Sequence, residues 1–438
     1  MAPAVPIVVS HKIRLTPNNK QKTYFKKAFG CARLAYNWGL RKWKEDYASG
    51  LRPTGRKVRD AFNAIRREEF PFTYEVTKYA TAHAFEDLQS AFDNLFDGNG
   101  RYPKFKRRKE GSGSFYLGND QFVLTYVNPN DRTSAKSPCP AERKHQYIKI
   151  PKCGCVRMTE TLRFNGKINC ATVSMEGDRY YVSISVTVDE DEYERTHPCH
   201  GNRTGDIGID LGCKDEMVTS EGLTIKSHRA YDNRLKRLRR LSRQLDKRVH
   251  ARTKQDREQG VKSSNNYLKL AKRLRKEHMR IKAVREDHIQ KVTTVLVDTA
   301  GGICIEDLDI KGMVRKADSG LARRLADVSM REIRREIEYK CAAKGTELIV
   351  VDRWYPSSKT CSCCGTVKKT LSLKERVYRC DNCGLEIDRD LNAAINLKNQ
   401  IENYRIGQGV PKSTPVDLDI LRRGLSRNRI ASKDEAGR

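Results

Sequence analysis

Four cysteines towards the C-terminal end of the chain have the spacing of a metal site. Cys361, Cys364, Cys380 and Cys383 form a C-x2-C-x15-C-x2-C pattern, and a glycine follows the second cysteine of each pair. Four thiolates at this spacing suit one tetrahedral Zn²⁺, and glycine allows the backbone to turn tightly around the metal. Because four protein ligands close the coordination shell, we expect one structural zinc in a ribbon over residues 357–386. Catalysis must then depend on other residues.

Three carboxylates occupy positions at which an apolar or capping residue would be ordinary. Asp210 lies inside an apolar strand, Glu306 ends a second apolar strand, and Asp390 begins a helix. Hard divalent cations need several converging oxygen ligands, so the three together could hold two Mg²⁺ ions that orient a water for attack on a phosphodiester. Each also has a structural explanation: a turn residue beside Gly212, a solvated strand end, or a helix N-cap.

Other titratable residues lie in the same stretches. The acidic residues that compete for the three positions are Asp206, Asp307, Asp309 and Asp388, and the sequence pattern does not choose among them. His278 and His288 lie in a long helical stretch. We interpret both histidines as partly buried helix residues rather than as ligands or catalysts.

The charge balance indicates a polyanionic partner. Lys and Arg number 86 and Asp and Glu 55, which gives a net charge of 86 − 55 = +31. So large an excess of positive charge repels itself unless counter-ions are present. Binding to nucleic acid therefore explains the charge better than a role in keeping the protein soluble does. No base-reading motif is visible, which favours backbone contacts over sequence readout. The candidate contact residues are Arg33, Tyr36, Trp38, Lys104, Lys106, Arg107, Arg234, Arg237 and Arg240. For Tyr36 and Trp38, a place in a helical core is the alternative.

The hydrophobic periodicity divides the chain into regions that must position these residues. Strand-like segments at 1–17 and 98–200 flank a helical region at 18–97, so the first strand is expected to return to a later β-domain. A second region at 201–356 contains both apolar strands and a basic pair of helices at 231–297, and residues 387–405 continue it after the ribbon. The polar tail at 406–438 is expected to be flexible.

The sequence also bears on the compartment. No apolar run approaches the ~20 residues of a transmembrane helix, and residues 1–9 resemble a first strand rather than a secretory signal. Single scattered cysteines fit a reducing environment. We therefore expect no membrane partner, and a location in the prokaryotic cytoplasm or nucleoid, or in the nucleus of a eukaryotic host.

Several of these segments together resemble the TnpB family, the OrfB-type, transposon-encoded, RNA-guided DNA nucleases that are related to type V CRISPR effectors. The similar segments are 208–212 (GIDLG), 303–308 (ICIEDL), the four-cysteine pattern and 388–394 (DRDLNAA). The run into the ribbon at 352–361 (DRWYPSSKTC) is also similar, and 36–38 (YNW) and 102–106 (YPKFK) resemble N-terminal motifs more loosely. The resemblance spans nearly the whole chain.

The resemblance implies an α+β multidomain protein. Its parts would be an RNase H-like (RuvC) α/β nuclease domain with the inserted zinc ribbon, and an N-terminal β-barrel wedge domain with a helical recognition insertion. Asp210, Glu306 and Asp390 would be the catalytic ligands of two Mg²⁺ ions. The partners would be a guide RNA and a double-stranded DNA target with a short adjacent motif, and we expect one protein monomer on one RNA. Base pairing by a guide explains how so basic a chain can lack a base-reading module.

Other functions remain open at this point. A compact type V CRISPR effector would share the three carboxylates. An RNA-guided regulator that binds DNA without cutting it would not need them, and a transposase acting directly on DNA would join strands. A zinc-ribbon RNA-binding protein would leave the carboxylates unexplained. Within the ribbon, Cys363 adds a third thiol to the first turn, although the glycine after Cys364 favours Cys361 and Cys364 as ligands.

Overall fold

The computed structural model describes residues 7–98, 100–108, 111–126, 146–197, 203, 205–213, 215–248, 263–372, 375–407 and 414–415. The chain forms two compact units, Met1–His197 and Pro198–Arg438. Both units contain helices and strands, which confirms the expectation of an α+β protein with more than one domain. Most of the polar tail, at 408–413 and 416–438, lies outside the described residues.

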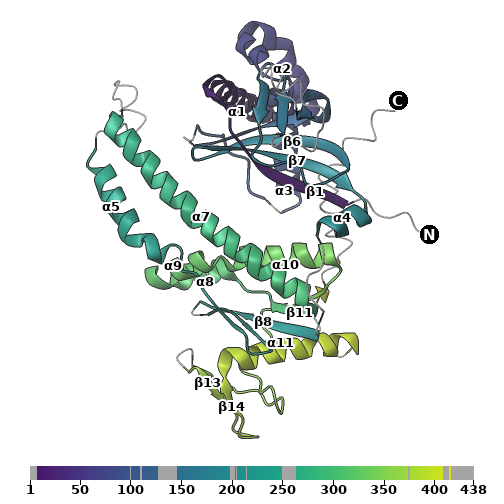
Figure 1. The fold of residues 1–438 in the computed structure, drawn as a ribbon, viewed down its shortest axis with the longest axis vertical. Coiled ribbons are helices and arrows are strands. Elements are labelled where there is room, and N and C mark those ends of the chain that lie inside the picture. Colours follow the sequence, from purple (N-terminus) through teal and green to yellow (C-terminus); the bar gives the residue numbers. More distant parts are fainter. Residues whose placement is uncertain are drawn as a thin grey trace, which may run out of the picture. The chain divides into compact units, whose positions relative to one another are not determined.

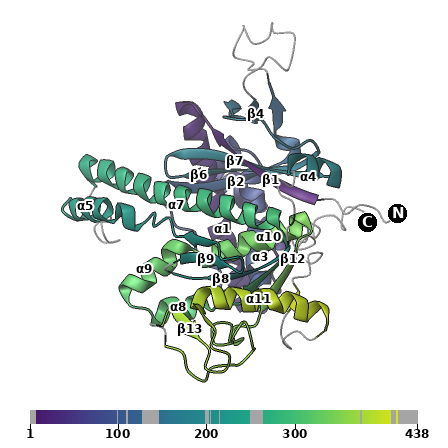
Figure 2. The same ribbon diagram turned by 60° about the horizontal axis from the view of Figure 1, so that its bottom comes forward.

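A four-stranded antiparallel sheet in the order β1-β7-β6-β2 forms the centre of the first unit (Figure 2). The alternating pattern that predicts the first strand has a direct cause, because Val9, His11, Ile13 and Leu15 are buried while Ser10, Lys12 and Arg14 between them are exposed. β1 pairs with β7 along its whole length, so the chain returns to its first strand after a long insertion. The strands are β1 (Ile7–Leu15), β2 (Ser112–Gly118), β6 (Lys167–Glu176) and β7 (Arg179–Val188).

The insertion between β1 and β2 is helical and has its own core, in which Leu40, Phe62 and Phe85 are fully buried. The first of its helices begins at a capping box: the Asn18 side chain accepts a hydrogen bond from the Gln21 N–H, and the Gln21 side chain accepts one from the Asn18 N–H. The helices are α1 (Asn19–Ala48), α2 (Gly55–Glu69), the short 3-10 helix η1 (Pro71–Glu75) and α3 (Tyr79–Phe96).

A second, three-stranded sheet in the first unit corrects one expectation. It consists of β3 (Val123–Thr125), β4 (Tyr147–Ile150) and β5 (Gly154–Arg157). Within the described residues the strands of this unit form two separate open sheets, so the expected β-barrel is not found there. A barrel requires continuous pairing around its circumference, whereas an isolated bridge between Leu15 and Met158 is the pairing described between the two sheets. The 3-10 helix η2 (Asn119–Gln121) precedes β3, and α4 (Glu190–Thr196) closes the unit.

The second unit contains a six-stranded mixed sheet in the order β10-β9-β8-β11-β12-β15. β8, β11 and β12 run parallel at its centre, while β9 and β10 continue β8 as an antiparallel meander and β15 pairs antiparallel with β12. This arrangement agrees with the expected RuvC-like domain. The strands are β8 (Gly205–Leu211), β9 (Asp215–Thr219), β10 (Thr224–Lys226), β11 (Ala300–Glu306), β12 (Glu347–Val351) and β15 (Thr414–Pro415).

Helices cover both faces of this sheet (Figure 1). On one face Ile303 and Ile305 of β11 pack with α7 (Asn265–Thr299) and α10 (Met330–Lys344). On the other face Cys304 packs with Leu397 and Ile401 of α11 (Arg389–Arg405). Because both faces are covered, the central parallel strands are nearly continuous apolar runs, and a carboxylate in them is conspicuous.

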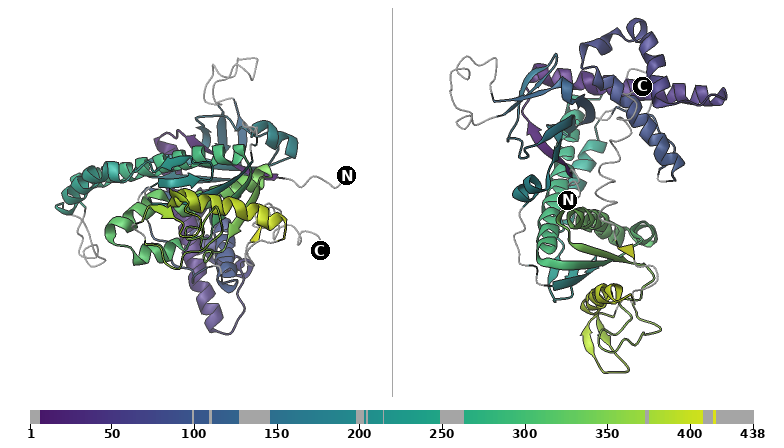
Figure 3. Two further views of the ribbon diagram at one scale, coloured as in Figure 1. Left: turned by 90° about the horizontal axis from the view of Figure 1, so that it is seen from below. Right: turned by 90° about the vertical axis from the view of Figure 1, so that its right-hand side faces the viewer.

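Three further parts complete the second unit. α5 (Leu235–Asp246) follows the 3-10 helix η5 (Asp232–Arg234) and packs against α7, as expected for the basic pair of helices (Figures 1 and 3). α8 (Ile310–Lys316) and α9 (Ser319–Val328) connect β11 to α10. The short strands β13 (Val377–Arg379) and β14 (Glu386–Asp388) pair within the cysteine ribbon. None of the described helices combines the length and apolar character needed to cross a membrane.

Candidate carboxylate active site and zinc centre

Asp210 and Glu306 lie on the same face of the sheet at the carboxyl ends of two neighbouring parallel strands, Asp210 as the last residue but one of β8 and Glu306 as the last of β11. β8 and β11 pair with Ile209 beside Ile305, so the next residue of each strand, Asp210 or Glu306, lies beside the other. Since successive side chains of a strand alternate, Ile305 enters the core under α7, and Glu306 shares the face of Cys304, which α11 covers. The carboxyl ends of parallel strands are the usual place for a ligand in an open α/β sheet.

Asp390 reaches the same region from the first turn of α11. The helix begins there because the Asp388 side chain accepts hydrogen bonds from the backbone N–H groups of Asp390 and Leu391, at 2.9 and 3.1 Å. The Asp390 carboxylate is 3.0 Å from Arg389 and 3.5 Å from Arg376. A strand end, a second strand end and a helix start therefore each contribute one carboxylate.

The acidic groups perturb one another. Desolvation, followed by repulsion from Glu306 and then from Asp390, raises the pKa of Asp210 to about 8. Desolvation also raises the pKa of Glu306, and this rise is opposed by the hydroxyl of Ser357, which donates a hydrogen bond to the Glu306 carboxylate. Negative charges that are held together against their repulsion favour a divalent cation among them.

The donor set of this site fits Mg²⁺, which prefers carboxylate oxygens to nitrogen and sulfur ligands. Within the described part of the chain, neither Asp210 nor Glu306 has an arginine or lysine at ion-pair distance, although the charge of Arg389 acts on Asp210, so a bound cation would supply most of the compensating charge. The oxygens of Asp210, Glu306 and Asp390 do not all lie within 4.8 Å of one another. Two ions about 3.5–4 Å apart could share such a set more readily than one ion could contact all of it.

The four competing carboxylates have structural roles of their own. Asp206 forms two hydrogen bonds with Arg405, at 2.6 and 3.0 Å. Asp307 pairs with two arginines, one from α10 and one from the segment after β12. Asp309 accepts a hydrogen bond from the first turn of α8, and Asp388 caps α11. These contacts account for the four residues without a bound ion.

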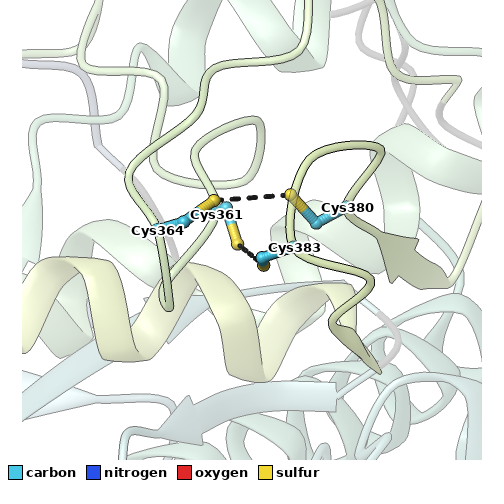
Figure 4. A group of neighbouring side chains, drawn as sticks. All are labelled: Cys361, Cys364, Cys380 and Cys383. Carbon is cyan, nitrogen blue, oxygen red and sulfur yellow. Dashed lines mark hydrogen bonds between the residues drawn. The ribbon is translucent and has the colours of Figure 1, made fainter.

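The four cysteines converge as their spacing predicts (Figure 4). Their Sγ atoms all lie within 4.8 Å of one another, and the Cys361–Cys383 and Cys364–Cys380 pairs are each 3.6 Å apart. A tetrahedral Zn²⁺ with Zn–S bonds of about 2.3 Å places its sulfurs about 3.8 Å apart, so the cluster fits one zinc ion. Cys363 is exposed and does not belong to the group.

The two turns of the ribbon are alike. Gly365 and Gly384 have φ values of +74° and +75°, a region that residues with a side chain rarely adopt. Their N–H groups donate to the carbonyl oxygens of Cys361 and Cys380, at 3.0 and 3.1 Å. Each glycine thus closes a tight turn that directs two thiols to the same point, and the closed ligand shell makes this a structural centre.

Two buried asparagines fasten the ribbon to α11. The side-chain amide of Asn392 donates to the carbonyl oxygen of Thr360 at 2.7 Å, and its Oδ1 accepts from the N–H of Ser362 at 3.0 Å. Asn396, one turn later, donates to two carbonyl oxygens of the same segment, at 2.8 and 2.7 Å. The helix that brings Asp390 to the carboxylates is therefore held by the folded ribbon.

Four of the candidate nucleic-acid contacts lie together in the first unit. Arg33, Lys104, Lys106 and Arg107 line a cavity of about 750 Å³. Tyr36 is 5% exposed, and Nζ of Lys106 lies 4.0 Å from the centre of its ring. The ring of Trp38 is 5.2 Å from that of a core phenylalanine. Tyr36 therefore lies in the helical core and Trp38 packs against it, while the basic side chains around the cavity remain accessible.

The arginines of α5 and of the turn before it lie in the second unit. Arg234 and Arg237 contact the buried carboxylate of Glu277 on α7, at 2.8 and 3.0 Å, and Arg280 contacts it at 3.0 Å. Three positive charges around one carboxylate leave a net positive surface. Arg240 is exposed on the same helix pair.

Several residues of the site are absent from the sequence-based set. Gly208 allows α11 to approach β8, Ser357 orients Glu306, and the asparagines described above fix the ribbon. Trp354, three residues before Ser357, is 82% exposed and so presents a free aromatic face. The four-residue spacing of Asn392 and Asn396 in a helix was a usable signal for their attachment to the ribbon (the asparagine clamp), whereas the contact of Ser357 with Glu306 depends on tertiary packing.

Three family models match the chain. A helix-turn-helix domain of OrfB-type IS605 proteins matches residues 9–52, a range that here contains β1 and the single long helix α1. The OrfB-type IS605 model described as "Probable transposase" matches residues 183–317. The TNB domain of Cas12f1-like proteins matches residues 331–397, which include the four cysteines.

Curated relatives match over most of the chain. A protein of Streptomyces pristinaespiralis named "Putative RNA-guided DNA endonuclease" is 32% identical over 394 residues, which are 88% of this chain and 87% of the relative. The Escherichia coli K12 protein named "Putative RNA-guided DNA endonuclease InsQ" is 25% identical over 401 residues, 88% of this chain and 90% of its own. A solved mini-RNA-guided endonuclease, CRISPR-Cas phi3, covers 90% of this chain and 92% of its own with a TM-score of 0.43 and 11% identity, too distant a likeness to support an argument.

Proposed function

Because the chain belongs to the TnpB family of OrfB-type proteins, we propose that it is an RNA-guided DNA endonuclease that cuts its target in a RuvC site. The relatives that span most of this chain carry an RNA-guided endonuclease activity in their names. The observation that carries the proposal is the convergence of Asp210 and Glu306 from adjacent strands with Asp390 from α11. Three converging carboxylates can serve phosphodiester hydrolysis by binding metal ions, whereas they have no evident role in stabilising the fold.

In this proposal Asp210, Glu306 and Asp390 bind two Mg²⁺ ions. When bound, the ions supply an activated water and stabilisation of the leaving 3′-oxygen. The remaining work belongs to the chain: Ser357 holds the Glu306 carboxylate in one orientation, and the asparagine clamp fixes the helix that carries Asp390. Arg389 and Arg376 lie beside Asp390, where a guanidinium can pair with the phosphate to be cut.

We assign the basic surfaces to the guide RNA and to the double-stranded DNA target. The accessible basic cavity of the first unit and the arginine-rich α5 offer contacts to phosphates that do not depend on sequence. Base pairing with the guide then selects the target, and the protein reads a short adjacent motif. The exposed ring of Trp354, three residues before Ser357, offers a stacking surface for an unpaired base.

The domain roles follow the same assignment. Residues 1–17 and 98–200 act as the wedge domain, and residues 18–97 as its recognition insertion. The nuclease domain consists of 201–356 and 387–405, with the zinc ribbon at 357–386 between its two parts. One protein monomer acts on one guide RNA.

The proposal is tested by sequencing the RNA that co-purifies when the gene is expressed with its native flanking DNA. A discrete RNA that ends in a variable segment is expected, because a guide has a constant, protein-bound part and a pairing part. Heterogeneous RNA would mean that the +31 charge binds polyanions without selection, and would favour an unguided enzyme. An RNA encoded by a CRISPR array, instead of the transposon end, would favour the type V effector.

A further inference from the structure

A second group of metal-ligating side chains lies in the second unit. Glu216 belongs to β9, His228 follows β10, and His288 belongs to α7. One ligand atom from each lies within 4.8 Å of those from the other two. Nε2 of His288 is 3.2 Å from Oε1 of Glu216, and Nδ1 of His228 is 3.5 Å from Oε2. Three separate elements thus direct ligand atoms to the same point.

The polar atoms of this group are buried and unsatisfied. Glu216 is 0% exposed. Within the described residues, both of its carboxylate oxygens, both ring nitrogens of His228 and Nε2 of His288 lack a hydrogen-bond partner. Buried polar atoms are normally paired, because an unpaired one loses its hydration without a compensating hydrogen bond. Five such atoms in one place therefore require an explanation.

The separations are those of ligands that share a metal ion. In a tetrahedral Zn²⁺ site with Zn–N and Zn–O bonds of about 2.0–2.1 Å, neighbouring nitrogen and oxygen ligands lie about 3.3 Å apart. The distances of 3.2 Å from His288 to one Glu216 oxygen and 3.5 Å from His228 to the other are close to this value.

The charges around the group are compatible with a cation. Burial lowers the pKa of both His228 and His288, which keeps the imidazoles in the neutral form that binds metal. Burial, followed by repulsion from Asp327, raises the pKa of Glu216 to about 7, and a bound cation would favour the ionised carboxylate again. Arg285, whose positive charge acts on His228, is 3.6 Å from Asp327, which offsets that charge.

We propose that Glu216, His228 and His288 bind a second Zn²⁺, with a water as the fourth ligand. Two histidines and one glutamate are a ligand set that zinc uses in proteins. Because the Glu216 carboxylate is fully buried, we assign this ion a structural role despite its water ligand: it would tie the meander of β9 and β10 to α7, the helix that carries half of the basic hairpin. This zinc site takes no part in the proposed nuclease chemistry, so the inference does not depend on that proposal.

The test measures zinc per chain in the full-length protein, freed of RNA by nuclease and high salt, loaded with Zn²⁺ and desalted. Two ions are expected in the wild type, one in Glu216→Gln and one in His288→Ala. His278→Ala is the matched control, because this exposed histidine lies on the same helix and should leave both ions in place. One ion in the wild type, or two in both Glu216→Gln and His288→Ala, would overturn the proposal.

Loading with Co²⁺ distinguishes this site from the ribbon without relying on any variant. Cobalt bound by four thiolates absorbs strongly through sulfur-to-metal charge transfer, whereas cobalt bound by nitrogen and oxygen shows only weak d–d bands. Titration of the wild type should reveal one equivalent of each kind. The absence of the thiolate-free equivalent would overturn the second site even if Glu216→Gln and His288→Ala failed to fold.

Discussion

Gly208 of β8 lies directly against Ala394 of α11: a Cβ atom added to Gly208 would be 2.0 Å from the carbonyl oxygen of Ala394. The backbones of strand and helix are in contact there, with no side chain between them. Asp210 follows two residues later on the same face of the strand, and Asp390 precedes Ala394 by one helical turn. The close contact therefore sets the separation of the two carboxylates.

Gly208→Ala should displace α11 and lower the rate of target cleavage by about 100-fold or more, since a displacement of 1 Å in a catalytic group can have that effect. Binding of the guide RNA should persist, because the contacts assigned to it lie on other elements. Cleavage rate and RNA binding are measured together. Gly30→Ala is the control, because its added Cβ would meet no atom within 4 Å apart from the neighbouring residues and backbone of its own helix. Unchanged cleavage by Gly208→Ala would show that the close approach is unnecessary.

Ser357→Ala should reduce cleavage about 10- to 100-fold and raise the Mg²⁺ concentration needed for half-maximal rate, because Glu306 loses the hydroxyl that orients it. The measurement is the cleavage rate as a function of Mg²⁺ concentration. Ser362→Ala serves for comparison, since Ser362 contacts α11 through its backbone N–H. An identical Mg²⁺ dependence in Ser357→Ala and wild type would contradict this role.

Asp210→Asn should change how stability depends on pH in the absence of Mg²⁺. The pKa of Asp210 is raised from 3.8 to about 8 in the folded protein. The folded state therefore retains a proton that the unfolded state releases above pH ~4, so this group makes the fold less stable as the pH rises towards ~8. The substitution should remove that loss and raise the melting temperature at pH 8 by a few degrees.

Melting temperatures of both proteins across this pH range, with and without Mg²⁺, provide the measurement. Mg²⁺ should stabilise the wild type and have little effect on Asp210→Asn. Asp206→Asn is a control for which the opposite effect is expected: it removes an ion pair with Arg405 and should therefore lower the melting temperature. Parallel curves for wild type and Asp210→Asn would exclude the raised pKa.

Cys380→Ser should release the ribbon zinc and lower the melting temperature, since a structural zinc site folds around its metal. Cleavage should fall as well, because the asparagine clamp on α11 holds a folded ribbon. Cys363→Ser is the matched control, as this exposed thiol lies outside the cluster and should leave the zinc content unchanged. Zinc retained in Cys380→Ser at the wild-type level would refute the ligand set.

The parts of the site that sequence predicts best are those formed by local structure. The cysteine spacing and the two following glycines determine the ribbon turns, because each turn spans only a few residues and needs a positive φ at its glycine. A carboxylate within an apolar run, as at Asp210, is likewise visible locally. The choice of Asp210, Glu306 and Asp390 as the catalytic set stays a prediction until the variants are assayed.

The parts that sequence did not reveal depend on tertiary contacts. The hydroxyl of Ser357 meets Glu306 only because the segment after β12 folds back over the end of β11. His288 resembles an ordinary helix residue until Glu216 and His228 are brought beside it. The expected barrel was wrong for the described residues because strand patterns predict which segments are strands, and do not fix which edges pair.

The central claim is tested most directly by cleavage of plasmid DNA that matches the variable segment of the co-purified RNA. Wild type with Mg²⁺ should cut the matched plasmid and leave a plasmid with a scrambled target intact. Asp210→Ala should bind the matched DNA with near wild-type affinity and cut it at least about 100-fold more slowly. Equal cutting by Asp210→Ala, or equal cutting of matched and scrambled DNA by the wild type, would contradict the account.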